Sequence, residues 1–118
     1  MTVFTSVAAN VVDPVQISDS TTTYYTAPAT AGGYAEVVEL IVANDTTTAI
    51  TFSIYKVNSG GTAGDANIIV KTQTLASGDA FSITELLGHL YLEPSGFIAA
   101  IASVASQATL HITAFEWS

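Results

Sequence analysis

The feature that most constrains this fold is a two-residue alternation of apolar and polar side chains, broken at short intervals by turn-forming residues. In the stretch 49–57, for example, Ile50, Phe52 and Ile54 share one face of an extended chain. Such alternation predicts half-buried β-strands. The stretches are rich in Thr, Val, Ile, Tyr and Phe, which favour strands, and no segment sustains the 3.6-residue period of a helix.

The turn residues divide the chain into about seven or eight short strands at intervals of roughly 8–12 residues. This spacing predicts an all-β fold, an antiparallel β-sandwich of the jelly-roll or Ig-like kind. The segment 80–87 is expected to form either a strand or one helical turn. The expected strands are 20–26, 34–43, 49–57, 68–75, 90–92, 97–104 and 108–117.

Two neighbouring strands, 34–43 and 49–57, are predicted to form an antiparallel hairpin across the short polar segment between them. Strict alternation in 34–43 places Val38 on the same face as Leu40 and Val42. It also places Glu36 and Glu39 on opposite faces, which prevents them from acting as a carboxylate pair.

The last strand has an aromatic face and an aliphatic face. His111, Thr113, Phe115 and Trp117 alternate on one side of 108–117, and Leu110 and Ile112 alternate on the other. We expect the aromatic side to pack against the second sheet, which leaves the aliphatic side for the surface or for contact with another subunit.

The first 18 residues differ from the rest of the chain. They are mostly apolar without clear alternation, and Asp13-Pro14 interrupts them. Because proline cannot donate to a sheet ladder, residues 1–18 are predicted to form an N-terminal arm or an edge strand, and residues 19–118 the sandwich domain. An arm that pairs with a neighbouring subunit would bring Phe4, Val7, Val11 and Val12 to the interface.

The charge of the chain limits its partners. Its 118 residues include 10 acidic residues and 2 lysines, for a net charge of −8, so binding to nucleic acid or to an anionic membrane is not expected. No apolar run reaches the ~20 residues of a membrane helix. Hydrophobic residues make up 49% of the chain and charged residues only 10%, which predicts apolar surface covered by other subunits.

Residues for catalysis or for metal binding are sparse. The chain has no cysteine, its two histidines are His89 and His111, and Asp65 is the only carboxylate in the Gly-rich segment 58–67. No serine lies in a nucleophile motif, and no Gly-rich loop carries the lysine of a phosphate cradle. We therefore expect no enzyme activity, no cofactor and no metal site.

Tyr24 and Tyr25 are adjacent, so one of them is expected in the core.

Several turn and strand motifs occur in a recognisable order. They are YTAPA at 25–29, EVVELIVAN at 36–44, ITFSIY at 50–55, LASGD at 75–79 and LYLEPSG at 90–96. In this order they resemble small β-sandwich virion proteins of tailed bacteriophages. One departure is Phe97, which follows Gly96 where the pattern often has Asp. The resemblance implies a role in the virion, as a head decoration (cement) protein or as a tail, fibre or baseplate component.

The first of these roles predicts a capsid decoration protein on the outside of the phage head. It would bind the major capsid protein as a homo-oligomer, and the family picture favours a trimer. The alternative is a receptor- or carbohydrate-binding module of the tail, with Trp117, Tyr24 or Tyr34 as stacking surfaces. The residues expected at an interface are Phe4, Val7, Val11, Val12, Tyr24 and Trp117.

Overall fold

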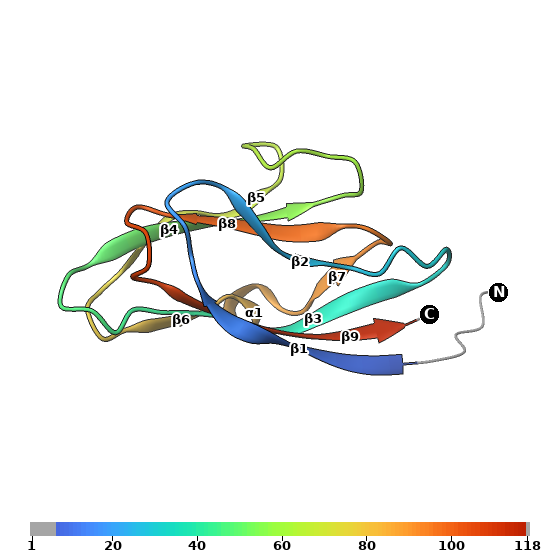
Figure 1. Cartoon of the computed structure of the whole chain (residues 1–118), viewed down its shortest axis with the longest axis horizontal. Coiled ribbons are helices and arrows are strands. Elements are labelled where there is room, and N and C mark those ends of the chain that lie inside the picture. Colours follow the sequence, from blue (N-terminus) through green and yellow to red (C-terminus); the bar gives the residue numbers. More distant parts are fainter. Residues whose placement is uncertain (1–6, 118) are drawn as a thin grey trace.

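The structure, a computed structural model, describes residues 7–117 and contains two antiparallel sheets packed face to face (Figure 1). The all-β sandwich predicted from the sequence is confirmed. One sheet contains β1 (Val7–Gln16), β3 (Tyr34–Ala43), β6 (Ala80–Ser82), β7 (Leu90–Leu92) and β9 (Thr109–Trp117). The other contains β2 (Thr22–Thr26), β4 (Ile50–Val57), β5 (Ile68–Leu75) and β8 (Phe97–Ala102).

The strand order identifies the sandwich as a jelly roll. The five-stranded sheet has the order β1-β9-β3-β6, with β7 also paired to β3, and the four-stranded sheet has the order β2-β8-β4-β5. The chain therefore passes from one sheet to the other between β1, β2, β3 and β4. When β6 and β7 are counted as one interrupted strand, this is the eight-strand, double Greek-key arrangement of a jelly roll.

The segment 80–87 forms both a strand and a helical turn, the two structures that its sequence predicts as alternatives. β6 pairs with one half of β3, the short helix α1 (Ile83–Leu87) follows at once, and β7 pairs with the other half of β3. Ser82 caps the helix, because its hydroxyl accepts a hydrogen bond from the Glu85 N–H. Ile83 is fully buried and anchors the helix beside β3.

The hairpin predicted between 34–43 and 49–57 is wrong, because β3 and β4 lie in different sheets. Asn44, at the end of β3, is buried and helps to hold the crossing segment. Its side-chain amide donates to three carbonyl groups, those of Thr48, Leu75 and Ala76, and its oxygen accepts from Thr46. These hydrogen bonds connect the segment between β3 and β4 to the turn between β5 and β6. The chain can therefore cross from one sheet to the other, and the buried faces of β3 and β4 meet across the core.

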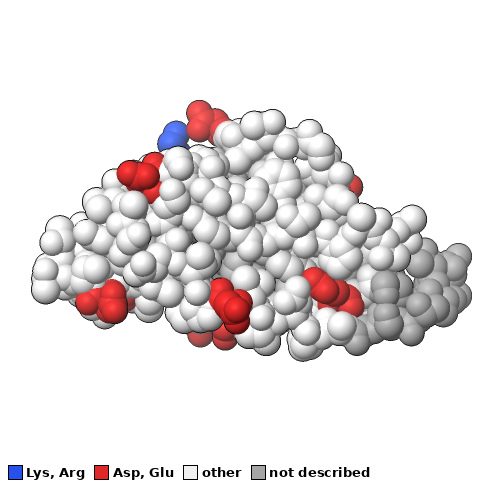
Figure 2. Space-filling model, in the orientation of Figure 1, with Lys and Arg blue, Asp and Glu red and all other residues white. Residues whose placement is uncertain are grey.

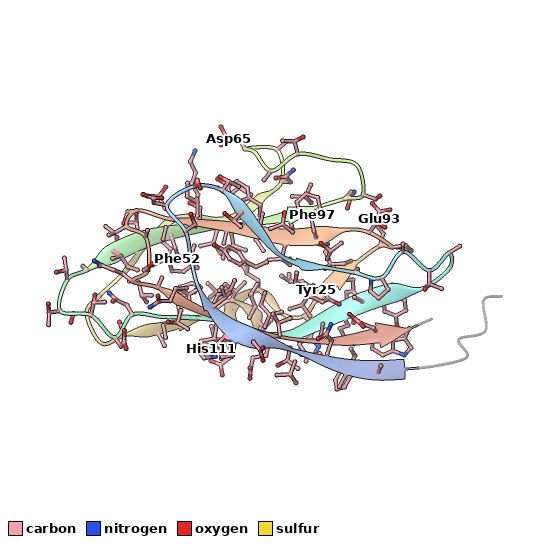
Figure 3. All side chains as sticks on the ribbon, viewed as in Figure 1. Tyr25, Phe52, Asp65, Glu93, Phe97 and His111 are labelled. Atoms are coloured by element: carbon pink, nitrogen blue, oxygen red, sulfur yellow. The ribbon has the colours of Figure 1, made fainter. Side chains whose placement is uncertain are left out.

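The core lies between the sheets and consists of aliphatic side chains with a few aromatic rings. As expected, Ile50, Phe52 and Ile54 of β4 are buried on one face. In Figure 3, Phe52 and Tyr25 lie between the two sheets. Tyr25 is buried and the neighbouring Tyr24 is half-buried against the core, which agrees with the expectation that one of the pair is a core residue.

A β-bulge in β3 changes which side chains face the core. The register with β9 runs from Val37↔Ala114 directly to Glu39↔Thr113, so Val38 has no partner residue in β9. Val37 is therefore buried together with Leu40 and Val42, whereas Val38 is only half-buried. The strict alternation predicted for 34–43 is wrong at this point, because one extra residue reverses the phase of the strand.

The N-terminal strand β1 is an edge of the five-stranded sheet and pairs with β9 of the same chain (Figure 1). The register is regular from Val7 to Val12 and shifts between Val12 and Val15, where Asp13-Pro14 lies. In the described part of the chain, no helix is both long and apolar enough to cross a membrane.

Candidate functional site: an aromatic sheet face

The outer face of the five-stranded sheet carries a group of aromatic side chains. Leu110, Ile112 and Ala114 of β9 point into the core, so the alternate residues of β9 point outward. The expectation that the aromatic side of this strand packs against the second sheet is therefore wrong. The sheets pack through the aliphatic side of β9, because burial of its other side would also bury the polar residues His111 and Thr113.

We call this surface the aromatic face and define it by Tyr34, Tyr91, Phe115 and Trp117. The sheet register brings the four rings together from β3, β7 and β9, because Tyr34 lies opposite Trp117, and both Phe115 and Tyr91 lie opposite Glu36. Residues directly opposite on antiparallel strands share a face, so the group follows from strand pairing.

The four rings lie in a row, in the order Tyr91, Tyr34, Trp117 and Phe115. Tyr34 and Trp117 are stacked, with centroids 4.7 Å apart and ring planes 11° from parallel. Tyr91 lies 6.0 Å from Tyr34, and Phe115 lies 6.2 Å from Trp117 in an edge-to-face arrangement. Tyr91 and Phe115, the two end rings of this row, remain 56% and 39% exposed, so they are the rings most available to a partner.

One carboxylate organises the polar side of the aromatic face. Glu36 Oε2 lies 2.6 Å from His89 Nδ1 and accepts a hydrogen bond from the Tyr91 hydroxyl at 3.4 Å. The negative charge of Glu36 raises the pKa of the Tyr91 hydroxyl above its ordinary value, and burial adds to the effect. The bulge at Val38 also turns Glu39 to this side, where its carboxylate accepts from Thr113 at 3.5 Å. Glu36 and Glu39 thus share a face, contrary to the sequence prediction.

Apolar side chains extend this surface. Val11 of β1 is 70% exposed and lies opposite Thr113, on the same outer face. Leu86 and Leu87 of α1 are also exposed, beside β3. Figure 2, which views the sandwich from the side on which the edges of the sheets lie, shows acidic side chains scattered over a largely uncharged surface. Such exposed apolar area without dense charge is typical of protein interaction surfaces.

The outer face of the four-stranded sheet is partly covered by the chain itself. The Gly-rich segment 58–67 folds over the end of β4 and β8, where Val57 and Ala99 are buried on the outer side. A Cβ atom on Gly61 would lie 2.9 Å from Cγ1 of Val57, so glycine lets the loop approach the sheet. One hollow beside this loop has a volume of about 310 Å³ and is lined by both polar and apolar side chains, including Thr23, Thr62 and Phe97.

A polar contact joins the sheets at one end of the core. The Tyr25 hydroxyl of β2 donates to the Glu116 carboxylate of β9, which also accepts from the Asn10 side-chain amide at 3.1 Å. Burial raises the pKa of the Tyr25 hydroxyl far above its ordinary value, and the hydrogen bond and charge of Glu116 raise it further. These hydrogen bonds connect β1, β2 and β9. Glu116 directly precedes Trp117, so they also fix the strand that carries part of the aromatic face.

The interface residues expected from the sequence lie in different places. Val11 and Trp117 lie on the aromatic side of the sheet, whereas Val12 is half-buried and packs against the core. Tyr24 lies in the other sheet, where its hydroxyl accepts a hydrogen bond from the Ser18 N–H at 2.7 Å. Val7 pairs with Trp117 through the β1–β9 register, and Phe4 lies outside the described residues.

Of the other members of the face, Tyr34 is among the stacking residues named from the sequence, whereas Tyr91 is not. The sequence places Phe115 on the same side of β9 as Trp117 but predicts that this side is buried. Tyr91 and Glu36 carry no local signal, because their proximity depends on the pairing of β3 with β7. In the described part of the chain, no three His, Asp or Glu side chains form a group that could hold a metal ion.

The chain matches no protein-family model and no curated protein sequence. Among solved structures it is similar to a chain of the Bacillus endospore appendages, which are described as disulfide-linked pili, with a TM-score of 0.56 and 15% identity over 96% of this chain and 88% of that chain. A chain of infectious bursal disease virus, Gx strain, aligns with a TM-score of 0.45 and 15% identity over 95% of this chain and 32% of that chain. At this identity the appendage likeness concerns the fold.

Proposed function

We propose that this chain is a non-enzymatic structural protein of a phage virion, and more specifically a capsid decoration (cement) protein. The observation that carries the proposal is the aromatic face, an exposed group of rings on the outer side of a jelly roll in a chain that has few charges. Support for the virion comes from the motif order in 25–96, which resembles that of phage virion proteins.

In this proposal the aromatic face binds the outer surface of the shell formed by the major capsid protein. Tyr91 and Phe115 are the most exposed rings, and aromatic residues dominate the energy of many protein interfaces. Burial of the rings and of Val11 would stabilise the shell against the pressure of packaged DNA. We also propose that several copies associate around each joint, with a trimer expected from the symmetry of such joints.

The net charge is compatible with a place on the head exterior. A chain with 10 acidic residues and 2 lysines repels DNA and anionic surfaces, so it would not bind either of them non-specifically.

The proposal is tested by binding of the protein to phage heads that lack it. The double substitution Tyr91→Ser and Phe115→Ser removes the two exposed rings, and we expect binding to weaken by about tenfold or more. Val104→Ser is the matched control, because Val104 is 43% exposed in the β8–β9 turn, away from the face. Cosedimentation of labelled protein with the heads measures the affinity. Unchanged binding of the double variant would contradict the proposal.

A second candidate function is a receptor- or carbohydrate-binding module of the tail. It is favoured by the Tyr91 ring, which is 56% exposed beside the Glu36 carboxylate, a pair that offers a stacking surface and a hydrogen-bond acceptor for a sugar hydroxyl. Against it, Tyr34 and Trp117 stack on each other, which uses one face of each ring. Glycan-array binding that is lost in Tyr91→Ser and retained in Tyr91→Phe would support this function over shell binding.

A further inference from the structure

The two sheets of a sandwich have four edges, and an open edge is a site where another strand can add. The edge formed by β6 and β7 is interrupted by α1, and each of these strands has only 3 residues. Short, interrupted strands cannot template a long pairing. This edge is therefore protected by its own sequence.

Both edges of the four-stranded sheet are also protected. β5 carries Lys71 in its middle, and Thr72 has a φ of 48° at a register shift in the β4–β5 ladder. A charged lysine and a bulge are two devices that prevent edge-to-edge pairing. β2 has only 5 residues, and its ladder with β8 shifts register between Thr23 and Tyr25.

The fourth edge, β1, is protected along only half of its length. Asp13-Pro14 and the register shift there block the C-terminal half. The N-terminal half, Val7–Val12, keeps a regular register with β9 and contains no proline, glycine or charged residue. On this half Ala8, Ala9 and Val11 are exposed. It is the one edge segment in the described residues that has none of the usual protective features.

The uncharged edge Val7–Val12 can contact a second copy of this chain without bringing acidic side chains of the two copies together. With a net charge of −8, contacts between copies bring acids together unless they form at uncharged segments. Val7–Val12 is such a segment. For two copies of the sheet to continue as one, outward residues must oppose outward residues, so a two-fold axis must pass through a residue position.

A pairing centred on Ala9 or Asn10 meets this condition. It places outward residues 9 and 11 of one copy against outward residues of the other and keeps Asp13 of the two copies at least about 20 Å apart, at ~3.3 Å per residue. The aromatic faces of the two copies then lie on the same side of one continuous sheet.

We propose that two copies of this chain pair antiparallel through residues 7–12 of β1, about a two-fold axis at Ala9 or Asn10. The pairing deepens the proposed structural role, on which it rests, because it names the partner of one edge. Because the pairing has a two-fold axis, it doubles the mass of the associating unit. That unit is either a single chain or the expected trimer.

Sedimentation of the isolated full-length protein, from micromolar to millimolar concentration, tests the pairing. The double variant Ala9→Glu, Val11→Glu places carboxylates opposite one another at the joint, and we expect it to sediment with half the mass of the wild type. Ala9→Thr, Val11→Thr is the matched control, since threonine favours strands and carries no charge, and we expect the wild-type mass. Circular dichroism and thermal unfolding check that both variants are folded.

A charge-swap experiment sharpens the test. Ala9→Lys, Val11→Lys should also have half the wild-type mass, and an equal mixture of the lysine and glutamate variants should recover the full mass. The proposal is overturned if the wild type never exceeds the mass of the glutamate variant, if the threonine control also dissociates, or if the mixture fails to associate. Because no capsid is present, these results do not depend on whether the aromatic face binds a shell.

Discussion

At the scale of single residues, the contact between Tyr25 and Glu116 shows how one polar pair can link two sheets. Both side chains lie at an end of the core. Tyr25 belongs to β2, and Glu116 of β9 also accepts a hydrogen bond from Asn10 of β1. A hydrogen bond to a charged group is worth more than a neutral one, and a buried partner that is left unpaired is costly. The pair is therefore expected to contribute measurably to stability although most of the core is aliphatic.

The substitution Tyr25→Phe tests this contribution. It removes the hydroxyl and leaves Glu116 with Asn10 as its partner, so we expect the free energy of unfolding to fall by about 1.5–3 kcal/mol at neutral pH. Urea unfolding followed by tryptophan fluorescence measures the change. A loss below about 0.5 kcal/mol would show that water replaces the tyrosine hydroxyl without cost.

The same pair predicts a pH dependence. The pKa of the Tyr25 hydroxyl is raised by folding, so its contribution is fully present below its ordinary value of 10.0 and is lost as pH rises toward the higher value in the folded state. Wild-type stability should thus fall more steeply above pH 10.0 than that of Tyr25→Phe. Equal slopes in urea-unfolding series at alkaline pH would contradict this assignment.

At the scale of elements, the bulge in β3 determines which residues form the aromatic face. Without Val38, the run Val37-Glu39-Leu40 would alternate inward, outward and inward, which is the burial that the structure has. Val38 is therefore the extra residue, and the halves of β3 on either side of it keep their pairing with β9.

Deletion of Val38 should leave the sandwich folded, with a loss of about 1–3 kcal/mol from the altered packing of α1 against β3. Deletion of Ile41 is the control. It should abolish cooperative unfolding, because it turns the end of β3 to the wrong face. Circular dichroism and urea titration of the two variants give the comparison. Equal damage from both deletions would show that the bulge is not the tolerant position.

The edge strand β1 offers a second test at this scale. Of its N-terminal half, Val12 packs partly against the core, whereas Ala8, Ala9 and Val11 are exposed. Deletion of residues 1–12 should therefore leave a cooperative β-sandwich of lower stability. It should also weaken self-association, which sedimentation would measure. An unfolded product would mean that the β1–β9 ladder is essential to the core, and full association would place the contact elsewhere.

At the scale of the whole molecule, the net charge bears on the proposed association of copies. Copies that each carry a net charge of −8 repel one another over long distances, and in the proposed pairing the local contact along the β1 edge opposes this repulsion. Association is therefore expected to depend on ionic strength with a definite sign.

Added salt should strengthen self-association of this protein. The Debye length falls from about 30 Å at 0.01 M to about 8 Å at 0.15 M ionic strength, which screens the repulsion while apolar contacts persist. Sedimentation at equal protein concentration and increasing sodium chloride measures the effect. The neutral solute sucrose, matched for viscosity, is the control. Weaker association at higher salt would mean that ion pairs between copies hold the assembly.

The sequence by itself determined most of the strand segments and, for 49–57, the buried face. Alternation is a local property, so Ile50, Phe52 and Ile54 could be assigned to the core before any partner strand was known. Turn residues likewise marked the ends of the strands. The all-β sandwich follows from these local patterns, because strands with one apolar face must pack that face against another sheet.

Only the tertiary structure decided which strands pair, which side of β9 faces the core and where β3 changes phase. Both faces of β9 carry apolar residues, and the choice between them depends on how closely each side packs against a sheet that is distant in sequence. The aromatic face could not be predicted for the same reason. Tyr91 and Phe115 come together through the pairing of β7 and β9 with β3, and such non-local pairing leaves no pattern within either strand.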